Sequence, residues 1–228
     1  MGVFTFLKAR KASVLCNKGD IPGAMKLYEE CVNEGLTDAR SLLTYTVLLI
    51  RDGQYKTARE LLVKMQKYQM TDADRCQLFV NYASCVYKMG EIQKGIEILE
   101  RQHAKQPNGL VYETLGYLYV EAGEYEKAVA FNLAAYEYDD EDPITLDNLG
   151  QTYYRLGNDK AAAKPYFEKA LEQKPGQIDT LYFLAQYDIE EGNKAAAKEK
   201  LEKALEGRFS PLNYASRDKV EAALKALQ

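Results

Sequence analysis

The stretch from Ile144 to Pro175 reads ITLDNLGQTYYRLGNDKAAAKPYFEKALEQKP, and it decides the fold. Apolar and small residues recur in it at helical spacing in two bursts, which a Gly-Asn turn at Gly157 separates. The residues that mark the two helices are Leu149, Gly150, Tyr153 and Leu156, followed by Ala163, Phe167, Ala170 and Leu171. Because proline is unfavourable in the interior of a helix, we expect Pro175 to end the second one. The stretch therefore predicts a hairpin of two helices.

The same hairpin recurs along the chain, as two series of small residues show. The turn glycines follow one another in steps of 34, 37, 33, 34 and 35 residues: Gly19, Gly53, Gly90, Gly123, Gly157 and Gly192. The small residues of the second helices keep nearly the same steps: Ala24, Ala58, Gly95, Ala128, Ala163 and Ala197. Glycine suits a turn with positive φ, and a small residue lets two helices pack closely. The series predict one array over residues 1–209, with hairpins at about 4–35, 39–69, 75–107, 109–140, 144–175 and 178–209.

These marks resemble the tetratricopeptide repeat (TPR) family. The family pattern is Leu-Gly-x-x-Tyr in the first helix, Ala-x-x-x-Phe-x-x-Ala in the second, and then Pro. The resemblance implies an all-α fold, a right-handed superhelical α-solenoid of six TPR-like helical hairpins. An apolar stripe at Val220, Ala223, Leu224 and Leu227 predicts a C-terminal capping helix within residues 210–228. The family resemblance further implies a concave groove lined by the first helices.

The chain departs from strict repetition at three places. Three extra residues precede the third repeat, and we assign them to the loop before Thr71, which with Asp74 predicts a helix cap. One extra residue in the fifth repeat is assigned to the turn at 157–159, because KAAAK occurs at 160–164 and again at 194–198. Pro165 then predicts a kink or a shifted helix start. In the fourth repeat Asn132 stands where an aromatic residue is usual, and we expect Phe131 to fill the space.

The resemblance also assigns groove positions, counted from Gly150 and its equivalents in repeats three to six. The candidate peptide-binding residues are Asn81, Ser84, Tyr87, Lys88, Glu113, Tyr117, Asp147, Asn148, Gln151, Tyr154, Arg155, Tyr182 and Gln186. Tyrosine is stiff and amphipathic, and asparagine offers both a donor and an acceptor to a peptide backbone. Family relatives use asparagine at this position to hold a ligand's main chain. The alternative is that these residues are ordinary surface polar groups and packing tyrosines.

Chaperone-binding relatives grip a terminal carboxylate with Lys and Asn, then Asn, then Lys and Arg on three consecutive repeats. No three consecutive repeats of this chain supply that set in register. We therefore do not expect it to bind the C-terminus of a heat-shock chaperone.

The composition disfavours several other functions. The net charge of −4 and the pI near 5.3 argue against nucleic acid and against an anionic membrane surface. With one histidine, His103, no Cys-x-x-Cys and no phosphate-binding glycine motif, we expect no catalysis, no cofactor and no metal site. The acidic run at 137–142 lacks the glycine of a calcium loop, so we expect a solvated connector. The four cysteines are expected to be reduced thiols on apolar faces, which favours a cytoplasmic location.

The sequence thus predicts a non-catalytic scaffold that binds a peptide or protein segment in its groove. The alternatives are a self-associating structural module, hence a homo-oligomer, or an interaction domain of a larger envelope or regulatory protein. No direct membrane insertion is expected, because the apolar stretch at the N-terminus is too short. If Asn148 and Tyr154 are groove residues, replacing both with alanine should abolish binding and leave the melting temperature nearly unchanged.

Overall fold

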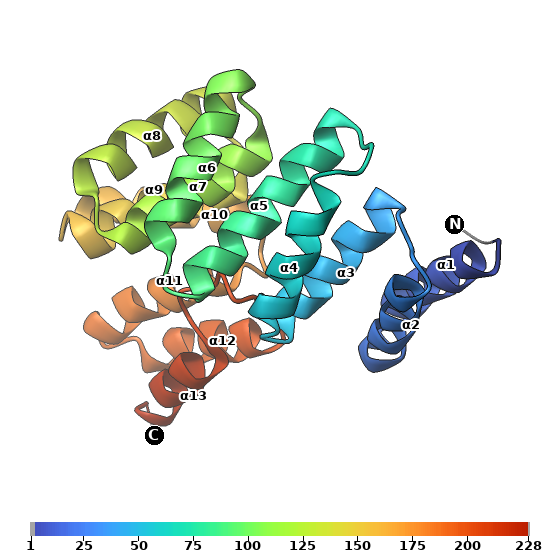
Figure 1. The fold of residues 1–228 in the computed structure, drawn as a ribbon. Helices are drawn as coiled ribbons and strands as arrows, with labels where there is room; N and C mark the ends of the chain where they lie inside the picture. The colour runs from blue at the N-terminus through green and yellow to red at the C-terminus, as the bar shows by residue number, and fades with distance from the viewer. Residues whose placement is uncertain (1–2, 228) are drawn as a thin grey trace. The chain divides into compact units, whose positions relative to one another are not determined.

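The computed structural model describes residues 3–227, and every regular element within them is helical. The chain divides into two compact units, residues 1–106 and residues 107–228. In both units consecutive helices form antiparallel hairpins, as the sequence predicts (Figure 1). No helix in the described part of the chain is both long enough and apolar enough to cross a membrane.

The first unit contains three hairpins. Its helices are α1 (Val3–Asn17), α2 (Ile21–Asn33), α3 (Ala39–Arg51), α4 (Tyr55–Met65), α5 (Asp72–Lys88) and α6 (Ile92–Lys105). The first helix of each hairpin packs on its own second helix, and α3 also contacts α1 and α5. Leu42, Leu49 and Leu62 are fully buried between the hairpins. The predicted cap at Thr71 is confirmed, since Thr71 accepts from the Asp74 N–H at 3.1 Å. Asp20 caps α2 in the same way and accepts from the Gly23 N–H at 3.0 Å.

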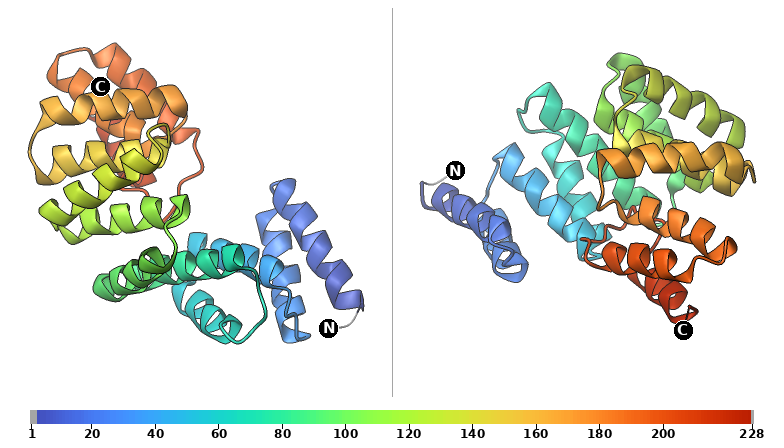
Figure 2. Two further views of the ribbon diagram at one scale, coloured as in Figure 1. Left: turned by 90° about the horizontal axis from the view of Figure 1, so that it is seen from above. Right: turned by 180° about the vertical axis from the view of Figure 1, so that it is seen from behind.

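The second unit contains three further hairpins and the predicted capping helix. Its elements are α7 (Gly109–Ala122), α8 (Tyr125–Tyr138), α9 (Pro143–Gln151), η1 (Thr152–Leu156), α10 (Lys160–Gln173), α11 (Ile178–Glu190), α12 (Lys194–Leu205) and α13 (Arg217–Lys225). Figure 2 shows these hairpins from two further sides, with α11 to α13 in orange and red. Helix α13 packs on α12 and buries Val220 completely, which closes the apolar end of the last hairpin.

The extra residue of the fifth repeat does not lie where the sequence comparison placed it. Instead of enlarging the turn at 157–159, it is absorbed by η1, a π-helical turn in which the Gly157 N–H donates to the Thr152 carbonyl at 3.0 Å. Gly157 has an ordinary φ of −78°, and the next residue, Asn158, takes the left-handed conformation with φ 51°. Helix α10 begins at Lys160 and continues through Pro165, so its start is not shifted. The π-turn changes the direction of the side chains that follow Thr152.

The expectation for Phe131 is also wrong. Asn132 itself occupies the buried place beside Gly116, where its Nδ2 donates to the Gly116 carbonyl at 3.4 Å and to Thr152 Oγ1 at 3.3 Å. Phe131 lies on the outer side, against the rings of Tyr112 and Tyr119. The physical reason is that a hydrogen-bonded amide replaces aromatic packing at this position.

Candidate functional site

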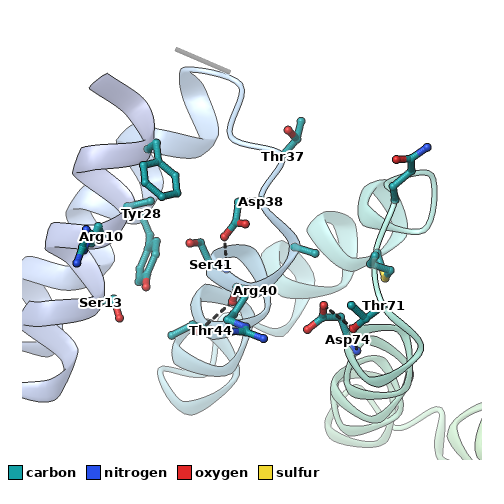
Figure 3. Close-up of a pocket in the computed structure, with 15 residues that line it drawn as sticks. Arg10, Ser13, Tyr28, Thr37, Asp38, Arg40, Ser41, Thr44, Thr71 and Asp74 are labelled. Atoms are coloured by element: carbon teal, nitrogen blue, oxygen red, sulfur yellow. Dashed lines mark hydrogen bonds between the residues drawn. The ribbon is translucent and has the colours of Figure 1, made fainter. Parts of the chain in front are cut away.

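An open hollow of about 730 Å³ lies on the first helices of the first unit (Figure 3). Helices α1, α3 and α5 and the two loops before α3 and α5 form its walls. The residues that line it are Phe6, Ala9, Arg10, Ser13, Tyr28, Thr37, Asp38, Ala39, Arg40, Ser41, Thr44, Gln69, Met70, Thr71 and Asp74. The wall is therefore mixed, with hydroxyl groups, two cations and a few apolar side chains.

The two arginines are the free charges of the hollow. Among the described residues, the guanidinium groups of Arg10 and Arg40 make no hydrogen bond or ion pair. The two carboxylates are already engaged, since Asp38 accepts from the Ser41 N–H at 2.9 Å and Asp74 accepts from Thr71 Oγ1 at 2.8 Å. An acidic group that entered the hollow would find two unpaired cations.

Tyr28 offers a further unsatisfied donor. Its side chain is fully buried and stacks on the Tyr45 ring, with ring centroids 5.6 Å apart. Its hydroxyl points toward Ser13 in Figure 3, but no partner meets hydrogen-bond geometry among the described residues. Burial raises the pKa of Tyr28 to about 12, so the group keeps its proton. An unpaired buried hydroxyl costs free energy, so Tyr28 lowers the stability of this part of the first unit.

The sequence prediction did not include this hollow. The groove positions counted from Gly150, applied to the first two repeats, would have identified part of it. Ala12 and Thr46 are the equivalents of Gly150 in the first two repeats. Counting from them places Arg10, Ser13 and Thr44 at groove positions, and all three line the hollow.

The predicted groove residues on α5 hold the first unit together. Asn81 is buried, and its Nδ2 donates to Thr46 Oγ1 on the preceding first helix at 3.0 Å. Ser84 is buried too and donates to the Val80 carbonyl at 2.9 Å. Tyr87 and Lys88 are half-buried, and the Lys88 Nζ lies 5.1 Å from the Tyr87 ring centroid. Only the last two therefore present surface to a partner.

In the second unit, three of the predicted groove residues form a buried polar network. Asp147 accepts from Thr180 Oγ1 at 2.6 Å and from Gln151 Nε2 at 2.7 Å. Asn148 donates to the Glu113 carbonyl at 2.9 Å. The side chains of Asp147, Asn148 and Gln151 thus link α9 to α7 and α11, and each residue is less than 5% exposed. Tyr117 is buried as well.

The π-turn directs the next two predicted residues to different neighbours. Tyr154 enters a cluster of rings, with centroids 5.0 Å from Phe183 and 5.6 Å from Tyr187. Arg155 pairs with Glu121 at 2.6 Å and donates to Gln151 Oε1 at 2.8 Å. Tyr154 and Arg155 are nevertheless half-buried, as are Glu113, Tyr182 and Gln186, so each of these five keeps some accessible surface.

Comparison with known proteins places these hairpins in a family. A family model described as a tetratricopeptide repeat matches residues 111–142 and 145–177. The crystal structure of a thermophilic TPR protein in Thermus thermophilus has a TM-score of 0.67 at 18% identity and covers 83% of this chain and 98% of that chain. Residues 111–142 and 145–177 are tetratricopeptide repeats.

Other similar proteins are much longer than this chain. Tetratricopeptide repeat protein 13 of Homo sapiens is 29% identical over 131 residues, which make up 58% of this chain and 15% of that protein. The crystal structure of the APC/C hetero-tetramer Cut9-Hcn1 has a TM-score of 0.70 at 18% identity and covers 95% of this chain and 41% of that chain. At these identities the structural likeness shows the fold alone.

Three carboxylates of the second unit are protonated more readily than usual. Burial raises the pKa of Glu113 to about 7, and the charges of Asp142 and Asp139 add to the effect. Burial also raises the pKa of Asp147, to which the nearby charge of Asp179 contributes, and burial raises the pKa of Asp179 itself. The folded protein therefore binds protons that the unfolded chain releases at neutral pH.

Asp147→Asn is expected to raise the melting temperature at pH 8 by about 2–4 °C and to change it little near pH 4. A raised pKa in the folded state means that stability is fullest below the ordinary aspartate value of about 4 and falls as the pH rises above it. The amide escapes this loss, and it can still accept from Gln151 and donate to the Thr180 hydroxyl. Thermal unfolding of both proteins from pH 4 to 8 measures the effect.

Asp218→Asn, a change at an exposed aspartate of α13, should give no such gain at pH 8. An equal gain for Asp147→Asn at pH 4 and pH 8 would contradict the assignment of a raised pKa.

Proposed function

We propose that this protein is a non-catalytic scaffold that holds an extended segment of another protein against its first helices. The observation that carries the proposal is the open hollow of about 730 Å³ on α1, α3 and α5. Hydroxyl groups of Ser13, Ser41 and Thr44 line it and suit a peptide backbone, which needs donors and acceptors together. The unpaired Arg10 and Arg40 suit an acidic side chain of that segment.

The family supports a role of this kind. TPR proteins are generally protein-interaction scaffolds, and one structural neighbour was solved within the hetero-tetramer Cut9-Hcn1. Each unit, taken by itself, also has half-buried groove residues that we propose as contact residues: Tyr87 and Lys88 in the first unit, and Glu113, Tyr182 and Gln186 in the second. The buried members of the predicted set contribute by fixing these helices in place.

Charge reversal at both arginines, Arg10→Glu with Arg40→Glu, is expected to weaken peptide binding by at least about tenfold. Hydrogen bonds to charged groups contribute about 1.5–3 kcal/mol each, and the new carboxylates would also repel an acidic side chain. The probes are peptides selected from a random phage-displayed library on the unmodified protein. Fluorescence anisotropy then gives the affinity of each selected peptide for each variant.

The control is Lys11→Glu, which makes the same charge reversal as Arg10→Glu on α1, at an exposed residue outside the hollow. It should leave the affinity within about twofold. Selected peptides that bind the doubly reversed variant as well as the unmodified protein would refute a role for this hollow.

A further inference from the structure

The segment between α12 and α13 lies on the first-helix side of the second unit. Residues 206–216 connect the two helices, and Asn213, Tyr214 and Ala215 within them contact Asp179 at the start of α11. A turn shapes the segment, because the Ser210 N–H donates to Asn213 Oδ1 at 2.7 Å and the Asn213 N–H donates to the Ser210 carbonyl at 2.9 Å.

Asp179 holds the segment largely through its main chain. One carboxylate oxygen accepts from the Ala215 N–H at 2.8 Å, and the other accepts from the Tyr214 N–H and from Asn213 Nδ2, both at 3.1 Å. Asp179 is 5% exposed, so these charge-assisted bonds are shielded from water. Two consecutive backbone N–H groups are a feature that any extended chain can present.

The Tyr214 ring fills an aromatic slot beside this carboxylate. It stacks on Phe183 with ring centroids 5.1 Å apart and planes at 20°, and its edge meets Tyr182 at 6.2 Å. The Arg155 guanidinium lies 4.0 Å from the ring centroid, which is the geometry of a cation–π contact. Phe183 and Arg155 thus pack on the ring from the body of the second unit, and Lys219 Nζ on α13 lies 3.7 Å from the ring centroid.

The slot is built by the second unit and not by the segment itself. Glu121 on α7 and Gln151 on α9 both bind the Arg155 guanidinium, and the π-turn delivers it to the slot. Asp179, Tyr182 and Phe183 all belong to α11. None of these contacts requires the covalent link between the segment and α12, so a separate chain with the same groups could make them.

We propose that this slot is a binding site for a tyrosine-bearing extended segment of a partner protein, and that residues 210–216 occupy it in cis as a competing ligand. The partner's tyrosine would stack between Arg155 and Phe183, and its following N–H groups would donate to Asp179. The proposal goes beyond the role of the hollow on the first unit, with which it shares no residue. The cis segment lowers the apparent affinity for the partner, because the slot is free only for a fraction of the time.

The test uses the full chain and a fluorescent peptide of residues 208–218, RFSPLNYASRD. Tyr214→Ala empties the slot, so the peptide should bind this variant at least about tenfold more tightly than the unmodified protein. The same peptide with alanine in place of its tyrosine should not bind. Asp179→Asn added to Tyr214→Ala should weaken binding again, because the charged acceptor is gone. Tyr214→Leu serves as a second emptied variant that keeps an apolar side chain, should the alanine variant fail to fold.

Equal binding to the unmodified and emptied proteins, or no binding to either folded emptied variant, would overturn the proposal. So would equal binding of the tyrosine and alanine peptides. Arg10→Glu with Arg40→Glu should not change the affinity of the emptied variant for the peptide. A loss there would mean that the peptide binds the hollow of the first unit, so the two proposals fail separately.

Discussion

Asn148→Ala combined with Tyr154→Ala is expected to lower the melting temperature by about 10 °C. Asn148 is 2% exposed and donates to the Glu113 carbonyl at 2.9 Å, so its loss removes a hydrogen bond that links α9 to α7. That costs about 0.5–1.5 kcal/mol. Tyr154 packs on Phe183 and Tyr187, and truncating a packed aromatic side chain adds about 2–3 kcal/mol when it is half-buried. Thermal unfolding followed by circular dichroism measures the sum.

The matched control is Phe4→Ala, which truncates an aromatic side chain that is 82% exposed. It should change the free energy of unfolding by less than about 0.5 kcal/mol. A double variant of Asn148 and Tyr154 that melts like the unmodified protein would mean that both side chains face solvent, as the sequence-based interpretation assumed.

The repeat architecture could be predicted because its causes are local in the sequence. Turn glycines, helix caps such as Thr71 and the apolar stripe of the capping helix are each specified within a few residues. Five of the six turn glycines have the positive φ that their spacing implies, Gly157 being the exception. These features determine where each helix begins and ends, and the helix boundaries in turn define the all-α fold.

Repeat spacing could not predict which groups the groove side chains contact. Asn148 and Asp147 stand at the expected register, but they bind neighbouring hairpins and not a ligand. Tyr154 is turned inward because η1 adds one residue upstream of the turn, and the sequence alone does not distinguish a π-turn from a longer loop. Repeat spacing predicts which side chains share one face of a regular α-helix. It fails where a π-turn interrupts the helix.

The contact of Tyr214 with the slot illustrates a second limit. The sequence predicts that α13 caps the array, but nothing in residues 206–216 repeats, so no family register applies to them. Their position depends on Asp179, a residue 35 positions earlier that has no groove assignment. Only the folded structure brings this carboxylate and these N–H groups together.

Arg155→Ala is expected to destabilise the protein by about 3 kcal/mol, which corresponds to a fall of about 6–12 °C in melting temperature. The side chains of Arg155 and Glu121 are 19% and 15% exposed, so removal of the cation deprives a carboxylate that is largely shielded from water of its ion pair with Arg155. The substitution also removes the contacts with Gln151 and with the Tyr214 ring. Urea unfolding at neutral pH gives the free energy of unfolding for each variant.

Lys164→Ala is the control, because it breaks an ion pair of the same charge type that is more exposed to water. Lys164 pairs with Glu191 at 3.0 Å, but their side chains are 38% and 51% exposed. Exposed pairs contribute about 0–1 kcal/mol, so this variant should unfold almost like the unmodified protein. Removing both partners, with Glu121→Ala added to Arg155→Ala, should cost less than the sum of the two single changes, because neither charge is then left alone. Equal losses for Arg155→Ala and Lys164→Ala would show that the Arg155 pair is exchanged with water and does not fix α7 against η1.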